Sequence, residues 1–243
     1  MAAHLQRVTI APHQYQDQTL RLTPAQQHYL YRVLRLQEGD RFIAMNGQGQ
    51  AWIAQLATNT AILQNGLEVT SELPIPLTLL VALPKGNGFE EIIRCGTELG
   101  VSAFVPVESD RTLLKPSPQK LKRWRRIAQE AAEQAERAIV PPLQDPLPFS
   151  EAVQALNPEQ QTGYICIARG EYPPLFNRLS PPPIQPISLF TGPEGGWTPK
   201  EIEAALEAGI QPVSLGKTIL RAITAPIVAT ALMTQLITVN SKP

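Results

Sequence analysis

Cysteine and histidine are scarce in this chain, and their positions exclude several kinds of site. The 243 residues include two cysteines, Cys95 and Cys166, and three histidines, all of which precede residue 29. Zinc sites need cysteines and histidines clustered at short spacing, and a disulfide framework needs more cysteines in pairs. The sequence therefore predicts neither a metal site nor a fold stabilised by disulfides.

Net charge is also absent, because 21 lysines and arginines balance 21 aspartates and glutamates. The chain as a whole gives no electrostatic sign of nucleic acid or membrane as a partner, so any such sign must be local. The N-terminal residues contain no apolar leader segment, which favours a cytoplasmic protein. With 43% apolar residues, the chain can fill the core of one large domain or of two small ones.

Residues 222–241 contain no charged side chain, and a run of this length is long enough to span a bilayer. Several threonines, a glutamine and a proline interrupt the run. These residues suit a helix packed inside a protein or against a second subunit better than a helix in lipid. We therefore predict a packed helix at this place and no membrane segment.

Residues 1–72 have the pattern of a small β-barrel domain with one helix. Three short segments predict strands: residues 7–10, 41–45 and 51–56. The sequence Asn46-Gly47-Gln48-Gly49 predicts a hairpin turn between two of them, and Thr23-Pro24 predicts the start of the helix. The proline-flanked residues 73–76 indicate a stiff linker, so we expect a second domain over residues 73–243.

Residues 73–243 alternate between strand and helix patterns, which is typical of an α/β domain with a mostly parallel sheet. The expected strands are residues 77–83, 101–107, 164–168, 187–190 and 212–215. The expected helices are residues 89–99, a long helix from Ser117 that the Pro141-Pro142 pair ends, one from Thr198 and one at 222–238. Thr198, Pro199 and Glu201 form a capping-box sequence, and Trp124 lies on the apolar stripe of the long helix, which predicts a core residue.

Three turns that contain glycine follow expected strands, at residues 84–88, 192–196 and 216–221. Open parallel sheets bind ligands at the carboxyl ends of their strands, although each turn alone can also be a tight connection without a ligand. A phosphate loop at Gly216 is disfavoured because Gln211 stands where that motif needs glycine, and no G-x-G-x-x-G sequence follows a strand. A ligand held by backbone and by apolar side chains such as Leu215, Ile219 and Leu220 suits an adenosine-like group.

Residues 111–137 carry the local positive charge that the whole chain lacks. Eight lysines and arginines stand there against three glutamates, a net of +5, whereas residues 139–210 hold three basic and eight acidic residues. One cationic face is typical of a protein that neutralises RNA phosphates. The alternative is a solvated helix face.

Four motifs resemble those of the RsmE family, the 16S ribosomal RNA uridine-N3 methyltransferases of the SPOUT superfamily. They are GPEGG at 192–196, LGKTILRA at 215–222, ELGV at 98–101 and RVLR at 32–35. The resemblance covers nearly the whole chain and implies an α/β, trefoil-knotted SPOUT methyltransferase domain behind an N-terminal PUA-like β-barrel that binds RNA. It also implies S-adenosyl-L-methionine as cofactor, 16S rRNA or the small ribosomal subunit as partner, and a homodimer.

The resemblance further implies roles for individual residues. The expected cofactor-binding residues are Leu83, Lys85, Thr191, Gly192, Pro193, Glu194, Gly195, Gly196, Leu215, Gly216, Ile219, Leu220, Arg221, Thr224 and Ala225. The expected catalytic residues are Arg221 and Arg111, whose cations would favour the uracil anion, the alternative being a salt bridge or a phosphate contact. Glu194 would orient substrate or brace its glycine turn. The expected RNA-binding residues are Arg32, Arg35, Lys120, Lys122, Arg123, Arg126 and Arg137.

The sequence departs from the family pattern at three positions. Ile223 stands where the family usually has glutamate, Thr218 where it usually has arginine, and Cys95 where lysine is common. The loss of an acid at a helix start predicts an altered cofactor or substrate geometry. Two other functions stay open: a ribose 2′-O RNA methyltransferase of the same superfamily, and a non-catalytic RNA-binding ribosome-assembly factor.

Overall fold

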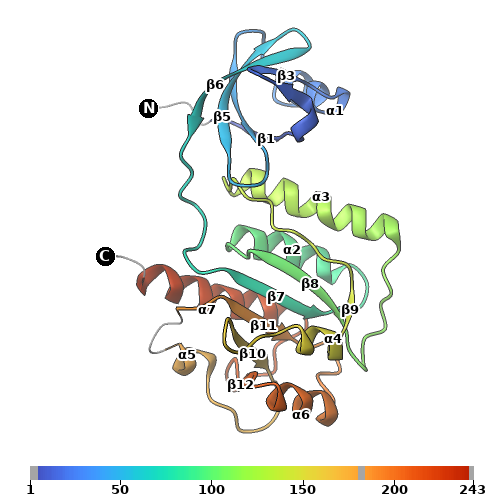
Figure 1. Cartoon of the computed structure of the whole chain (residues 1–243). Helices are drawn as coiled ribbons and strands as arrows, with labels where there is room; N and C mark the ends of the chain where they lie inside the picture. The colour runs from blue at the N-terminus through green and yellow to red at the C-terminus, as the bar shows by residue number, and fades with distance from the viewer. Residues whose placement is uncertain (1–4, 180–183, 241–243) are drawn as a thin grey trace. The chain divides into compact units, whose positions relative to one another are not determined.

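The structure is a computed structural model that describes residues 5–179 and 184–240 (Figure 1). The chain divides into two compact units. The first contains residues 1–72 and 132–140, and the second contains residues 73–131 and 141–243. The first boundary falls at the proline-flanked segment, whereas the sequence pattern did not indicate that residues 132–140 pack with the first unit.

The first unit is built on a curled six-stranded sheet in the order β1-β4-β5-β6-β3-β2 (Figure 1). Strand β1 pairs parallel with β4, and the other neighbours pair antiparallel. The strands are β1 (Arg7–Thr9), β2 (Tyr15–Gln16), β3 (Thr19–Arg21), β4 (Arg41–Met45), β5 (Ala51–Ala57) and β6 (Thr60–Leu67). The helical segments are η1 (Pro12–Gln14), α1 (Pro24–Gln27) and the π-helical η2 (His28–Val33).

The helix predicted at Thr23 is confirmed, and it closes the core of this sheet. The Gln26 amide donates to the Thr23 hydroxyl at 3.2 Å, while Gln26 Oε1 accepts from the Thr23 amide at 2.9 Å, which completes a capping box. Helix α1 continues directly into η2, whose Leu30 is fully buried among side chains that include Leu20 and Phe42. This helical segment and the curled sheet therefore form one apolar core.

A buried ion pair attaches residues 132–140 to the first unit. Arg137 is only 2% exposed, and its Nη2 lies 2.6 Å from Glu72 Oε2. Nearby, the Gly49 amide donates to the Ala138 carbonyl at 3.1 Å. The hairpin turn predicted from the glycines therefore also holds a segment that is distant in the sequence.

The long helix α3 (Pro118–Gln134) ends earlier than predicted. The prediction that the Pro141-Pro142 pair ends this helix is wrong, because Glu136 already has a left-handed φ of 58°. Helical hydrogen bonding does not continue through that conformation. The chain after Gln134 instead turns into the segment held by Arg137.

The second unit contains a six-stranded sheet in which all neighbouring strands are parallel, in the order β12-β10-β11-β7-β8-β9. This confirms the predicted α/β arrangement with a parallel sheet, and the trefoil knot stays a prediction. The strands are β7 (Leu77–Ala82), β8 (Ala103–Glu108), β9 (Leu147–Pro148), β10 (Thr162–Cys166), β11 (Ile187–Thr191) and β12 (Gln211–Val213). The helices besides α3 are α2 (Gly88–Glu98), α4 (Phe149–Gln154), α5 (Leu175–Arg178), α6 (Pro199–Glu207) and α7 (Thr224–Asn240).

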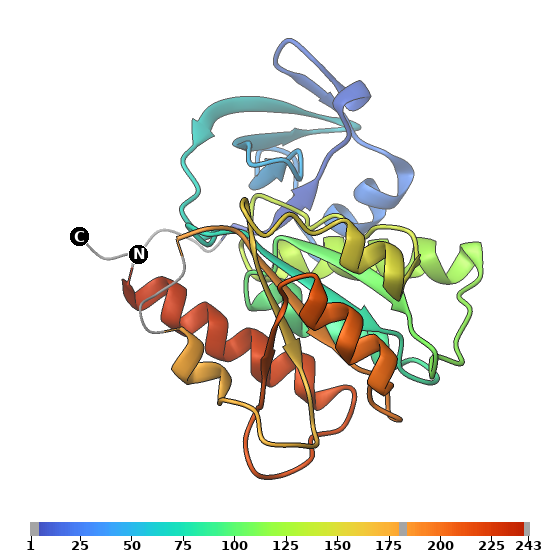
Figure 2. The ribbon, with the colours of Figure 1, turned by 60° about the horizontal axis from the view of Figure 1, so that its bottom comes forward.

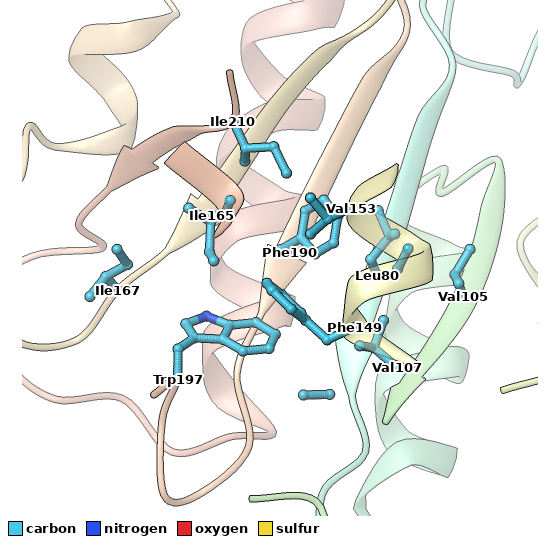
Figure 3. Packing of buried hydrophobic residues seen from close by; sticks show 13 residues of the cluster. Leu80, Val105, Val107, Phe149, Val153, Ile165, Ile167, Phe190, Trp197 and Ile210 are labelled. Carbon is cyan, nitrogen blue, oxygen red and sulfur yellow. The ribbon is translucent and has the colours of Figure 1, made fainter. Parts of the chain in front are cut away.

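Helices α4 and α6 pack against one face of this sheet (Figure 2). Phe149 of α4 contacts both Phe190 of β11 and Trp197, with ring centroids 6.0 and 4.9 Å apart (Figure 3). The Trp197 indole N–H donates to the Cys166 carbonyl at the end of β10, at 3.1 Å. Because Trp197 directly follows the glycines at 192–196, the core fixes the end of that turn.

Helices α2 and α7 contact each other in the second unit, and α7 also contacts β7. The Thr234 hydroxyl of α7 donates to the Leu99 carbonyl just after α2, at 2.7 Å. Trp124 of α3 is fully buried and packs edge-on against Phe89 at 4.6 Å, which confirms the prediction that it is a core residue. Within residues 5–179 and 184–240, no helix has the length and hydropathy that crossing a membrane requires.

Replacing Arg137 by alanine should lower the free energy of unfolding by about 2–3 kcal/mol, because Glu72 then loses its cation in a partly buried place. The control is Arg125→Ala, since Arg125 and Asp145 pair at 2.6 Å but are 49% and 76% exposed. That variant should change the unfolding free energy by less than about 1 kcal/mol. Urea denaturation measures both, and equal losses in the two variants would contradict this account.

Candidate functional site

A cavity of about 670 Å³ lies at the carboxyl ends of the parallel strands in the second unit. Its walls come from the segments that follow β10, β11 and β12, together with Arg111 from the segment after β8. The lining residues are Arg111, residues 166–169, residues 192–197, Ile202, residues 214–216, residues 218–223 and Ala225. The volume falls within the range of about 300–1,000 Å³ that is typical of small-molecule sites.

Most of the expected cofactor-binding residues line this one cavity. They are Gly192, Pro193, Glu194, Gly195, Gly196, Leu215, Gly216, Ile219, Leu220, Arg221 and Ala225. The fold brings together two turns that are about twenty residues apart in the sequence, because both follow strands of one parallel sheet.

Four of the expected cofactor-binding residues do not line the cavity. Leu83 and Thr191 are 1% and 0% exposed and belong to the core at the strand ends. Thr224 is the first residue of α7. Lys85 reaches the edge of the site with its backbone, since its amide donates to Glu194 Oε1 at 3.0 Å.

One glycine in each of the two turns, Gly196 and Gly216, presents bare backbone to open space. Gly196 and Gly216 have φ of 68° and 126°, and apart from their chain neighbours no described residue has an atom within 4 Å of the place that a Cβ would occupy. Both turns therefore need glycine for their backbone conformation and leave room for a ligand. With the apolar side chains of Leu215, Ile219 and Leu220 beside them, these turns fit the ribose and base of an adenosine-like ligand.

Arg111 holds the GPEGG turn from outside. Its Nη1 donates to the carbonyl oxygens of Gly195 and, at 3.4 Å, of Trp197. A Cβ on Gly195 would lie 2.9 Å from Arg111 Cδ, so glycine at this position lets the arginine side chain lie across the turn. The Arg111 guanidinium is thus already engaged in hydrogen bonds within the protein. Arg111 therefore clamps the turn and also lines the cavity.

A buried carboxylate positions Arg111. Glu201, at the first turn of α6, is 5% exposed and accepts from the Thr198 amide at 2.7 Å, as the capping-box sequence predicted. Its other oxygen accepts from the Asp110 amide at 2.9 Å. Since Asp110 immediately precedes Arg111, the start of α6 also fixes the segment that carries the clamp.

Two other arginines line the cavity with their side chains unengaged. Within the described chain, the guanidiniums of Arg169 and Arg221 have no hydrogen bond or ion pair, and both residues are exposed. The lining contains one carboxylate, Glu194, which accepts from Lys85. These groups make the cavity wall positive, which suits an anionic substrate or an anion that forms during reaction.

Cys166 also lines the cavity, but its burial disfavours a covalent role. Burial raises the pKa of its thiol to about 12. The thiol is therefore protonated at neutral pH, and a protonated thiol is a poor nucleophile.

The predicted RNA-binding side chains on α3 are mostly engaged within the second unit. The Lys120 ammonium donates to the Gly86 carbonyl at 2.8 Å and to Asn87 Oδ1 at 3.1 Å. Arg123 pairs with Glu90 at 2.8 Å, and Arg126 pairs with Glu130 at 2.7 Å. Only Lys122 among these four has no such partner in the part of the chain that the structure describes, so carboxylates offset much of the charge counted in the sequence.

The three predicted RNA-binding residues of the first unit differ in exposure. Arg32 and Arg35 are exposed on and just after η2, and Arg32 lines a surface hollow with His28 and Tyr31. Arg137 is buried and paired with Glu72. The buried and paired guanidinium of Arg137 is not available at the surface, so the structure does not support its predicted contact with RNA.

Several cavity residues are not among those predicted from the sequence, chiefly Arg169, Trp197 and Ile202. The sequence pattern does not indicate a loop at Arg169, because it predicts a strand up to residue 168, whereas β10 ends at Cys166. The following Gly170, with φ of 105°, was a signal for a turn at this place. Of the three departures from the family pattern, Thr218 and Ile223 line the cavity, and Cys95 lies on α2 outside it.

Comparisons with known proteins agree with this architecture. A family model described as an RNA methyltransferase domain matches residues 71–234, and one described as an RNA methyltransferase PUA domain matches residues 22–62. Proteins named ribosomal RNA small subunit methyltransferase E are similar to this chain. The protein from Synechocystis is 52% identical over 93% of this chain and 76% of its own length, and that from Bacillus subtilis is 32% identical over 87% and 88%.

A solved structure of the same name is similar over nearly the whole length. It is the crystal structure of ribosomal RNA small subunit methyltransferase E from Neisseria gonorrhoeae bound to S-adenosyl methionine. It matches with a TM-score of 0.86 and 31% sequence identity, over 96% of this chain and 98% of its own.

Replacing Arg111 by alanine should loosen the GPEGG turn, because two backbone carbonyls lose a charged donor. Hydrogen exchange of the amides in residues 192–197 should become about tenfold faster or more. Arg169→Ala is the control, since it removes a guanidinium from the same cavity without removing a bond to this turn. Unchanged exchange in Arg111→Ala, or the same increase in both variants, would show that Arg111 is not a clamp.

Proposed function

The chain belongs to the RsmE family of ribosomal RNA small subunit methyltransferases, and from this premise we propose that it transfers a methyl group from S-adenosylmethionine to N3 of a uridine in 16S ribosomal RNA. The observation that carries the proposal is the cavity at the ends of β10, β11 and β12. Its bare glycine turns and apolar wall fit an adenosine-like cofactor, and its unengaged arginines fit an RNA substrate.

S-adenosylmethionine supplies an activated methyl group on a sulfonium, so the protein must mainly align the donor with the acceptor nitrogen. Transfer of the methyl group would leave S-adenosylhomocysteine, and the uridine N3 must release its proton to water. A nearby cation favours the resulting imide anion. We assign this role to Arg221, because its guanidinium is not engaged elsewhere in the described chain. Glu194 braces its turn against Lys85, and Arg111 clamps the same turn.

Fewer basic side chains are available for RNA contacts outside the cavity than the sequence predicts. We propose that Lys122, Arg123 and Arg126 on α3, and Arg32 and Arg35 in the PUA-like unit, contact phosphates. Ion pairs between exposed side chains contribute little to stability, so an RNA phosphate can replace the carboxylate partner of an arginine at small cost. A protein acting on ribosomal RNA in this way would work in the cytoplasm.

We also propose that the protein is a homodimer through α7. The helix carries no charge from Thr224 to Asn240. Ala229 and Met233 are fully buried within the second unit, while Val228 and Leu232 are half-buried and Val239 is 65% exposed. A helix that is apolar on both sides needs a second surface, which another copy of the chain can provide.

Incubating the protein with labelled S-adenosylmethionine and small-subunit ribosomal RNA should yield N3-methyluridine after digestion to nucleosides. Arg221→Ala should lower the methylation rate about a hundredfold. It should also move the rate profile to higher pH, because loss of the cation raises the pKa of the bound imide. Mass spectrometry of the nucleosides measures the product, and Lys200→Ala, an exposed change outside the cavity, is the control.

The products of that assay separate the alternatives. A ribose-methylated nucleoside would replace the proposal by a 2′-O methyltransferase. Absence of any methylated nucleoside, with naked RNA and with small subunits, would favour a non-catalytic assembly factor. An unchanged rate in Arg221→Ala would remove that residue from the reaction.

Light scattering at micromolar concentration should give about twice the 26.7 kDa mass of one chain. Replacing Val228 and Leu232 by lysine should shift the mass to that of a monomer, because charges would then face the buried interface. The control is Thr224→Lys, at an exposed residue of the same helix. A monomer for the unchanged protein would rule out the dimer, and a dimer that survives both lysines would move its interface away from α7.

A further inference from the structure

Gly88 is the first residue of α2, and its backbone does not explain why it is glycine. It is not among the residues with positive φ, so other amino acids can adopt its conformation. Space is the constraint instead. A Cβ at residue 88 would lie 2.6 Å from Ile223 Cδ1, 2.7 Å from Ile223 Cγ1 and 3.3 Å from Pro84 Cγ. Real carbon atoms do not approach so closely, so Ile223 occupies the place of the missing side chain.

This contact joins two segments that are far apart in the sequence. Ile223 lines the cavity and directly precedes α7, so it belongs to the wall formed by residues 214–225. On the other side, the turn before α2 is held at several points. Glu194 accepts from the Lys85 amide, and the Lys120 ammonium donates to Gly86 and Asn87. Ile223 therefore packs against Gly88, at the end of a turn that hydrogen bonds hold in place.

We propose that Gly88 is a positioning residue for the cofactor cavity: it seats Ile223 and so keeps the wall of residues 214–225 away from the ligand. The proposal rests on the proposed binding of S-adenosylmethionine in this cavity. It gives the isoleucine at position 223 a function, since an apolar side chain fills the space over a glycine without needing a hydrogen-bond partner.

The contact predicts a specific pattern of damage and repair. With alanine at residue 88, the Ile223 side chain must shift, and Pro84 lies on one side of it. Because Ile223 lines the cavity, we expect the side chain to move into the open volume there. The ligand would then lose space. Replacing Ile223 by alanine removes both atoms that approach Gly88, so the second change should relieve the first. Such coupling is expected only for side chains that touch.

The test is calorimetric titration of S-adenosylhomocysteine into the full chain and its variants Gly88→Ala, Ile223→Ala and Gly88→Ala/Ile223→Ala. Gly88→Ala should weaken binding about tenfold. The double variant should bind within about threefold of Ile223→Ala. Gly66→Ala is the matched control, because apart from its chain neighbours no described residue has an atom within 4 Å of a Cβ at residue 66, and its φ is not positive. Thermal melting shows whether each variant is folded.

Wild-type affinity in a folded Gly88→Ala protein would overturn the proposal. If Gly88→Ala does not fold, the double variant tests the proposal instead. A folded double variant with the affinity of Ile223→Ala supports the role of Gly88 in positioning Ile223, and an unfolded or weakly binding one overturns that role. Absence of binding by the unchanged protein would contradict the proposed function instead, so the two failures are distinguishable.

Discussion

The Glu201 carboxylate is the contact on which the rest of the site depends. One oxygen accepts a hydrogen bond from the Thr198 amide and so caps the start of α6. The other accepts a hydrogen bond from the Asp110 amide, in the segment after β8. A carboxylate that is 5% exposed needs such donors, and each of them holds a different loop. The loop after β8 thereby carries Arg111 to the carbonyls of the GPEGG turn, so the start of one helix determines the geometry of two loops.

Parallel strand ends then bring the remaining parts together. The turns after β11 and β12 offer glycine backbone, and the segment after β10 adds Arg169. The arginines of the cavity divide into two classes. The Arg111 guanidinium forms hydrogen bonds within the protein, whereas those of Arg169 and Arg221 have no partner within the described chain. This division follows from hydrogen bonding and not from position, since all three line the same cavity.

Local interactions were predictable from the sequence, and long-range pairings were not. The capping box of Thr198 and Glu201, the helix start at Thr23 and the glycine turns all depend on residues within a few positions of each other. The sequence pattern shows Arg137 as a free cation, because its partner, Glu72, is 65 residues away. For the same reason the charge count on α3 overstated its free cations, since Glu90 lies outside that helix. The contact between Gly88 and Ile223 left no local pattern at all.

The turns after β11 and β12 together form the proposed S-adenosylmethionine site, and a crystal structure of the protein with S-adenosylhomocysteine would show where the ligand binds. We expect the ligand between residues 192–197 and residues 214–225, with its adenosine against the bare backbone of Gly196 and Gly216 and the apolar wall. Ligand density elsewhere, or contacts with only one of the two turns, would contradict the proposed site.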